Sequence, residues 1–534
     1  MAWTRRGLIG AGAAAAALPA AQLDAAKRNP FSADWSSLAA GYRAPDWFRD
    51  AKFGIWAHWG PQCVPEFGDW YARRMYQRGH KYYNHHLATY GHPADTGYLD
   101  LIGRWKAEHW DPDALIDRYV RAGARYFVAM ANHHDNVDMY RSRHHGWNTT
   151  RVGPKKDIVG GWAAAARKRG LRFGVSNHSA HAWHWQQVAY GYDAEGPRTG
   201  ARYDAFRLSK ADGRGTWWEG LDPQDLYTGR NMVIPDGLTT IADANDWHAK
   251  NDRVWTEAPP PNNPLFVARW AARCCDLIDS YRPDLLYFDD AGLPLGQTGL
   301  DVAAHYYNAG LGWHGGRQEV VLNVKEVPPE RRAAVVADVE RGVRAEIDSQ
   351  PWQTDSCIGD WHYDRKIFDE HRYKPAATVI HRLVDIVSKN GNLLLSVPVK
   401  PDGTIDSDER AILDDLTAWM AVNGESIYDT RPYRAFGEGP TQPVTGAFGE
   451  GRSKPYTAAD IRYAVKGDTL YATVLGWPAG GIRMRELAGE RVARVDLLGA
   501  GEVAFAQDEN GITLTLPQAP AVPQPAHVFR LRRA

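Results

Sequence analysis

The 534-residue chain is poor in cysteine, with only Cys63, Cys274, Cys275 and Cys357. Four cysteines at these positions do not form a disulfide framework, because neighbours such as Cys274 and Cys275 rarely bridge each other. Their spacing also fits no zinc motif. The chain has no excess of either charge, since 63 Lys and Arg face 64 Asp and Glu. Nucleic-acid binders usually show a basic excess or stripe, so we expect no nucleic-acid partner.

Long apolar runs are also missing. The run at residues 9–21 is shorter than the ~20 residues that a bilayer requires, and no later segment is long and apolar enough to span a membrane. A charged start at Arg5-Arg6, this short run and small residues near Ala20 are typical of an export signal. The arginine pair resembles a twin-arginine signal, with an ordinary Sec signal as the alternative. We expect residues 1–26 to be a signal and the protein to be periplasmic or secreted.

Tryptophan and histidine are abundant, with 22 and 20 residues. Indole rings are suited to stacking on flat apolar faces of ligands, but a large Trp-rich core is the simpler explanation. Hydrophobic residues make up 44% of the chain and charged residues 24%, which is typical of a folded globular protein. This much apolar surface can bury a core, which excludes a disordered chain.

Short apolar runs alternate with longer amphipathic stretches over most of the chain. Strands are predicted at 53–58, 126–132, 172–177, 285–290, 319–324 and 393–398, and helices at 112–122, 158–168, 265–281, 376–388 and 407–422. Strands that are apolar throughout and separated by helices indicate a parallel sheet with both faces covered. The length and number of these units favour an α/β fold of the closed (β/α)8 TIM-barrel type.

Two segments interrupt this alternation. Residues 186–261 are polar and weakly periodic, and their Trp217-Trp218 pair predicts an ordered insertion over one end of the barrel. Glycines and prolines mark residues 436–454 as a linker. Short alternating strands follow, so we expect a barrel over 27–435 and a small antiparallel β-sandwich domain over 455–534.

Polar residues recur where the predicted strands end. In barrels these carboxyl ends carry the catalytic groups, and here they hold His58-Trp59, His133-His134-Asp135, His178, Asp289-Asp290 and Asn323. Adjacent histidines on an extended segment point to opposite sides, so we expect His133 and His134 to bind hydroxyl groups rather than one metal ion. Glycine-rich phosphate loops are absent after the strands, and we predict neither a metal nor a cofactor.

Asp289 follows the wholly apolar run 285–288. A carboxylate delivered by a buried strand is costly unless it is hydrogen bonded or functional, which favours a reactive role. Asp290 precedes Ala291-Gly292 and has the context of a turn or cap residue.

The order of these motifs resembles family 29 of the glycoside hydrolases, the retaining α-L-fucosidases. Residues 52–60 are similar to the first-strand signature of that family, Asp69-Trp70-Tyr71 to its Glu-Trp-Tyr, and Asn132-His133-His134-Asp135 to its Lys-His-His-Asp. Segment 281–289 resembles the segment that bears the nucleophile, and 390–395 and 423–428 resemble the end of the family's barrel. Segments 460–463 and 475–478 resemble its C-terminal β domain.

The resemblance implies a double displacement with two carboxyl groups. Asp289 would be the nucleophile. Glu340 is the preferred acid/base because it precedes an aromatic-rich segment, with Glu326 and Glu66 as rivals. By the same resemblance the sugar-binding residues would be His58, Trp59, Asp69, Trp70, His133, His134, Tyr287, Lys325 and Trp361, with Trp361 against the fucose methyl group.

The resemblance thus predicts an exported enzyme that removes terminal α-L-fucose from oligosaccharides or glycoconjugates. Asp at 69 and Asn at 132 shorten two side chains relative to the family, which leaves the exact sugar and linkage open. Two alternatives remain at this point. The chain could act on a related sugar, such as a sulfated fucan or a galactoside, or it could be a barrel that binds carbohydrate without turnover.

Overall fold

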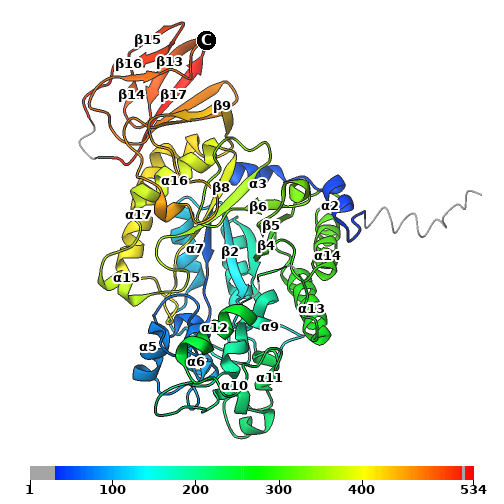
Figure 1. Ribbon diagram of the computed structural model, residues 1–534. Coiled ribbons are helices and arrows are strands. Elements are labelled where there is room, and N and C mark those ends of the chain that lie inside the picture. Colours follow the sequence, from blue (N-terminus) through cyan, green and yellow to red (C-terminus); the bar gives the residue numbers. More distant parts are fainter. Residues whose placement is uncertain (1–29, 254, 257, 520–522) are drawn as a thin grey trace, which may run out of the picture.

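The computed structural model describes residues 30–253, 255–256, 258–519 and 523–534. The predicted export signal at 1–26 lies outside these residues. A closed barrel of parallel strands forms the middle of the molecule, and antiparallel sheets lie at the end of the chain (Figure 1). Both parts of the predicted fold class are therefore confirmed.

Eight strands close the barrel in sequence order. They are β1 (Phe53–Ala57), β2 (Tyr126–Asn132), β3 (Arg172–Asn177), β4 (Leu285–Ala291), β5 (Val321–Lys325), β6 (Val336–Asp338), β7 (Trp352–Cys357) and β8 (Gly391–Ser396). The ring closes where Ile55 of β1 pairs with Leu395 of β8. Nearly every strand residue is buried because side chains fill the interior and helices cover the outside.

Helices cover the barrel, and several of them begin at a residue whose side chain caps the first turn. They are α2 (Trp35–Gly41), α3 (Asp46–Ala51), α7 (Pro112–Arg121), α8 (Ile158–Lys168), α13 (Pro264–Tyr281), α14 (Gln297–Trp313), α15 (Arg365–Asp369), α16 (Ala376–Ser388) and α17 (Ser407–Asn423). Asp111 and Asp157 accept backbone N–H groups at the starts of α7 and α8. Asp406 and Glu409 form a capping box on α17. Only the short 3-10 helix η5 (Pro329–Ala334) separates β5 from β6.

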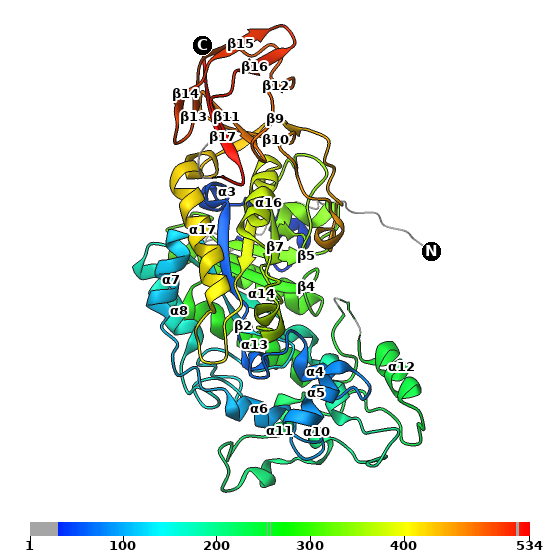
Figure 2. The same cartoon turned by 90° about the vertical axis from the view of Figure 1, so that its left-hand side faces the viewer.

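A lobe covers the carboxyl end of the barrel, and two distant segments build it (Figures 1 and 2). After β1 come η1 (Pro61–Cys63), α4 (Tyr71–Arg74), α5 (Lys81–Thr89) and α6 (Tyr98–Arg104); after β3 come η2 (Ser179–His181), α9 (Ala182–Trp185), η3 (Gln186–Tyr190), α10 (Asp204–Arg207), η4 (Lys210–Gly213), α11 (Pro223–Leu226) and α12 (Ile241–Asn251). Buried polar contacts join the two segments: Tyr76 donates to Asp204 at 2.7 Å, and Arg73 pairs with Asp252 at 2.6 Å.

The C-terminal domain has a core of its own, separate from that of the barrel. One sheet has the order β14-β13-β17-β11-β10-β9 and the other β12-β16-β15. Their bounds are β9 (Arg431–Glu438), β10 (Ile461–Lys466), β11 (Thr469–Val474), β12 (Ile482–Met484), β13 (Val492–Leu497), β14 (Gly501–Glu502), β15 (Phe505–Asp508), β16 (Gly511–Leu514) and β17 (His527–Arg533), with η6 (Gly424–Ser426) and η7 (Glu450–Arg452) outside the sheets. Because β9 already pairs with β10, this sheet begins before the predicted linker.

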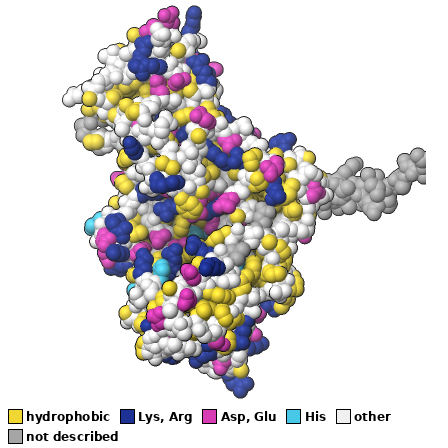
Figure 3. Space-filling view, in the orientation of Figure 1, with side chains coloured by type: hydrophobic (Ala, Val, Ile, Leu, Met, Phe, Trp, Pro, Cys, Tyr) yellow, Lys and Arg dark blue, Asp and Glu magenta, His cyan; other side chains and the backbone are white. Residues whose placement is uncertain are grey.

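Charges of both signs are interspersed over the face seen in Figure 3, as the near-zero net charge leads one to expect. In the part of the chain that the structure describes, no helix is both long enough and apolar enough to cross a bilayer.

Candidate active site

A cavity of about 470 Å³ opens at the carboxyl end of the barrel strands. Most of the residues that the sequence singled out lie there, because parallel strands deliver their last side chains to one end of a barrel. The lining residues are Trp56, His58, Asp69, Trp70, Arg74, His133, His134, Arg253, Trp255, Asp289, Asp290, Ala291, Lys325, Glu326, Glu340, Asp355, Asp360, Trp361 and Phe448.

One ammonium group joins the carboxylates of this cavity. Lys325, the last residue of β5, forms ion pairs with Asp289 of β4, with Glu340 (Nζ to Oε2, 2.7 Å) and with Asp355 of β7 (Nζ to Oδ2, 3.3 Å). Asp289 and Glu340 keep 15% and 19% of their side chains exposed, so a ligand in the cavity can reach both. Asp355 is fully buried and also accepts a hydrogen bond from Tyr287.

The two accessible carboxyl groups that contact Lys325 have opposite pKa shifts. Burial by itself would raise the pKa of Asp289, but the charges and hydrogen bonds of Lys325 and His178 outweigh it and hold that pKa well below its ordinary value. Burial, followed by the neighbouring anions Asp355 and Asp289, raises the pKa of Glu340 to about 7 despite the opposing Lys325. Near neutral pH Asp289 is therefore ionised, and Glu340 keeps a substantial protonated fraction.

His178 contacts the second oxygen of Asp289, with Nδ1 2.7 Å from Oδ2. Its backbone N–H donates to the side chain of Asn132, and its carbonyl oxygen lies 2.6 Å from Nδ1 of His134. Asn132 donates in turn to Asp138, which pairs with the buried Arg273. Asn132 thus helps to fix the histidine beside Asp289.

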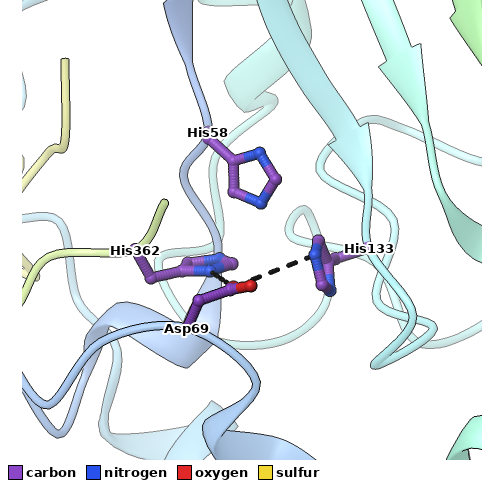
Figure 4. Close-up of side chains that lie close together, drawn as sticks. All are labelled: His58, Asp69, His133 and His362. Carbon is purple, nitrogen blue, oxygen red and sulfur yellow. Dashed lines mark hydrogen bonds and ion pairs between the residues drawn. The ribbon is translucent and has the colours of Figure 1, made fainter. Parts of the chain in front are cut away.

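Four side chains from separate segments of the chain lie close together at one wall of the cavity (Figure 4): His58, Asp69 and His133 line the cavity, and His362 is fully buried next to Asp69. Asp69 lies 2.6 Å from Nδ1 of His362 and 4.0 Å from Nε2 of His133. The amide nitrogen of Gln62 lies 2.8 Å from Nδ1 of His133 and can only donate, so Nε2 of His133 carries a proton and points toward Asp69. Both ring nitrogens of His58 are buried without a protein partner, which leaves them for a ligand.

This wall has the donor atoms for two kinds of ligand. The ligand atoms of His58, Asp69, His133 and His362 lie within 4.8 Å of one another, as do those of His133, His134 and His178, so either set could hold a metal ion. Burial lowers the pKa of His58, of His133 and, to about 3, of His134, which keeps these imidazoles neutral. A neutral imidazole both donates and accepts, as recognition of a hydroxyl group requires.

Two predicted binding residues do not line the cavity. Trp59 is fully buried, with its ring edge-on to Trp105 and its indole N–H donating to the carbonyl of Lys400, so it is a core residue. Tyr287 lies behind the wall and contacts Asp289 and Asp355 through its hydroxyl group. Both residues were predicted from the resemblance to the family's motifs, which does not tell which side of a strand end faces the opening.

Glu326 and Glu66, the two alternatives to Glu340 as the acid/base, lie in different places in the fold. Glu326 lines the cavity and is exposed at its edge. Glu66 is not among the lining residues; it pairs with Arg365 at 3.6 Å, and burial raises its pKa. Of the three glutamates, Glu340 is the one that shares an ammonium group with Asp289.

Sequence reasoning missed several lining residues and misread one. Asp290 belongs to β4 and is buried against His181 (3.1 Å), where burial and the neighbouring Asp289 raise its pKa well above the ordinary value, so it is not a turn residue. Asp355 comes from a strand that was not predicted. Trp255 and Phe448 come from the predicted insertion and linker. The signal available there was an aromatic residue in a segment of low hydrophobicity, and the structure shows that both rings are exposed.

The family model described as alpha-L-fucosidase matches residues 18–425, and the model of the alpha-L-fucosidase C-terminal domain matches residues 454–532. The chain is 27% identical to the tissue alpha-L-fucosidase of Mus musculus, over 92% of this chain and 91% of that protein. It is 26% identical to the plasma alpha-L-fucosidase of Homo sapiens, over 91% and 89%.

Solved structures show the same fold. The alpha-fucosidase of Thermotoga maritima superposes with a TM-score of 0.67 at 23% identity, over 94% of this chain and all of that one. The alpha-L-fucosidase isoenzyme 1 of Paenibacillus thiaminolyticus superposes with a TM-score of 0.60 at 21% identity, over 91% and 98%.

Proposed function

The chain belongs to the alpha-L-fucosidase family of glycoside hydrolases, and from this premise we propose that it releases terminal α-L-fucose with retention of configuration. The observation that carries the proposal is the pair Asp289 and Glu340 on one ammonium group. Two oxygens that contact the same nitrogen lie within about 5 Å of each other, which is the separation that a retaining mechanism uses.

In this mechanism Asp289 attacks the anomeric carbon, and Glu340 protonates the departing glycosidic oxygen. A nucleophile must be ionised and a general acid protonated, and the opposite pKa shifts of the two groups supply both states near pH 7. A covalent fucosyl-enzyme forms on Asp289. Glu340, now ionised, then takes a proton from the water that hydrolyses this ester.

The substrate that we propose is a fucosylated oligosaccharide or glycoconjugate. The neutral imidazoles of His58, His133 and His134, with Asp69, would bind the sugar hydroxyl groups, and Trp361 would pack against the fucose methyl group. We further propose that residues 1–26 direct export to the periplasm or the medium and that 27–435 form the catalytic domain. The binding wall would work without a metal, so a chelator should leave activity unchanged.

The proposal is tested with an aryl α-L-fucoside, the configuration of the first sugar released being read by proton NMR. We expect the α anomer from the wild type and background activity from Asp289→Ala. Glu340→Ala should retain hydrolysis mainly of substrates with good leaving groups, and added azide should restore turnover as an azide adduct. A β anomer as first product, or normal turnover by Asp289→Ala, would refute the proposal.

One observation favours a decorated substrate as a second candidate. Arg74 and Arg253 line the cavity, lie 5.2 and 5.3 Å from the ring of Trp70, and have no carboxylate partner among the described residues. Unpaired guanidinium groups bind sulfate or carboxylate well. If this candidate is right, a sulfated fucoside has a higher kcat/KM than its neutral counterpart, and Arg74→Gln with Arg253→Gln removes the difference. Equal values in the wild type exclude it.

A further inference from the structure

Phe448 is an unusual residue at the edge of the cavity. It lies in the segment between β9 and β10, which composition marked as a linker, yet its ring lines the cavity and is 59% exposed. Its backbone φ of +56° is in the left-handed region, which is unfavourable for any residue with a Cβ and which Gly446 nearby adopts without strain. An exposed aromatic ring held on a strained backbone at a cavity indicates a functional constraint.

The segment around Phe448 is fixed to the loop that carries Glu340. The N–H of Phe448 donates to the carbonyl of Glu340 at 2.8 Å, and Gly446 donates to Val343 at 2.9 Å. The two backbones approach so closely that a Cβ at Gly342 would lie 2.0 Å from the carbonyl oxygen of Gly446. Backbone contacts therefore hold the ring of Phe448 beside the Glu340 loop.

Glu450 anchors the same segment to the barrel from the other side. Its carboxylate is almost completely buried, forms an ion pair with Lys374 and lies 3.4 Å from Nε of Arg382. It also accepts a hydrogen bond from Ser356 at 2.8 Å. These contacts hold Phe448 at the cavity edge, where its ring remains largely exposed to solvent.

The position relative to Glu340 determines which part of a substrate meets the ring. A general acid stands on the leaving-group side of the scissile bond, because it protonates the departing oxygen. Phe448 is bonded to this residue and lies farther out, since Glu340 keeps only 19% of its side chain exposed. The apolar face of an aryl or pyranose ring is the chemistry that stacks on a phenyl ring.

We propose that Phe448 is the stacking platform of a leaving-group subsite, which binds the ring attached to fucose through the scissile oxygen. This inference rests on the proposed function. It makes a segment outside the barrel strands and their connecting loops part of substrate recognition, and it assigns the choice of aglycone partly to that segment.

The test compares two substrates, 4-nitrophenyl α-L-fucoside, whose leaving group is a ring, and α-L-fucosyl fluoride, whose leaving group is one atom. We expect Phe448→Ala to lower the ratio of kcat/KM for the aryl substrate over the fluoride roughly 2- to 10-fold, the range of one aromatic stacking contact. Phe448→Tyr should keep the wild-type ratio. Leu265→Ala, which alters a side chain of equal exposure outside the cavity, should change neither rate.

Phe448→Gly separates recognition from folding. Glycine relieves the left-handed backbone, so this variant should unfold at the wild-type temperature or above while the substrate ratio falls as in Phe448→Ala. A ratio that stays at the wild-type value in both variants would overturn the inference while leaving the proposed function intact. If the wild type hydrolyses neither substrate, the proposed function itself fails.

Discussion

Protonation distinguishes the two carboxyl groups on Lys325. Burial and the neighbouring anions raise the pKa of Glu340 to about 7, so its acid form predominates below that pH and is lost above it. The pKa of Asp289 lies well below its ordinary value, so its ionised form persists into acid solution. We therefore expect kcat/KM to fall as the pH rises through about 7. On the acid side, kcat/KM should stay constant until the pH drops below ~4.

Substitution tests this assignment. Glu340→Gln should lower kcat for an aryl fucoside by roughly 10²- to 10⁴-fold and remove the alkaline limb of the pH profile. Glu326→Gln, which changes an acid at the cavity edge, should keep that limb. An alkaline limb that survives in Glu340→Gln but disappears in Glu326→Gln would transfer the acid/base role to Glu326.

The residues of the site divide by how much of their position is encoded locally. His58, His133 and Asp289 were found because each follows an apolar strand, and parallel strands bring such residues to one end. His362 and Asp360 follow a strand that is rich in polar residues. No apolar run therefore predicted a strand end at this place. Arg253 and Phe448 reach the cavity through long connections, whose paths depend on contacts distant in the sequence.

The strands themselves show the same division. Six predicted strands match β1 to β5 and β8 within about two residues at their ends. The sequence did not indicate β6, which has three residues, or β7, whose residues Gln353, Thr354 and Asp355 are polar yet buried. These side chains find polar partners inside the barrel: Gln353 donates to Asp338, and Asp355 contacts Tyr287 and Lys325. Hydropathy cannot foresee such internal pairing.

Two tryptophans that follow barrel strands, Trp59 and Trp361, lie in different surroundings, which predicts different effects on substitution. Trp59→Ala removes a fully buried ring, and we expect a loss of roughly 3–5 kcal/mol in the free energy of unfolding with little change in KM. Trp361→Ala removes a ring that lines the cavity, so KM should rise with a smaller loss of stability. Urea unfolding of both variants measures the loss of stability, and steady-state kinetics measures the change in KM. A raised KM and unchanged stability for Trp59→Ala would show that Trp59 is a binding residue after all.

At the scale of the whole molecule, a buried charge cluster joins the barrel to the C-terminal domain. Asp385 of α16 pairs with Lys389 at 2.9 Å and with Arg462 of β10 at 2.6 Å, and all three side chains are nearly inaccessible. The two cations, against the effect of burial, hold the pKa of Asp385 below its ordinary value. Trp419 of α17 adds a hydrogen bond to the carbonyl of Ala526.

Removing the shared anion should weaken this junction. Asp385→Ala leaves two buried cations unpaired, and we expect a loss of about 3–5 kcal/mol in the free energy of unfolding by urea. Asp414→Ala, which breaks an exposed pair with Arg118, should cost about 1 kcal/mol or less and serves as the control. Equal losses in the two variants would mean that the cluster does not hold the domains together.

The central claim is that Asp289 forms the covalent bond to fucose. A 2-deoxy-2-fluoro-fucosyl fluoride reacts in the first step of a retaining mechanism and stalls before the second, so peptide mass spectrometry locates the trapped sugar. We predict one added 2-fluorofucosyl group, on the peptide that contains Asp289, and no label on Asp289→Asn. A label on any other carboxylate, or no label on an enzyme that turns over aryl fucosides, would contradict the account.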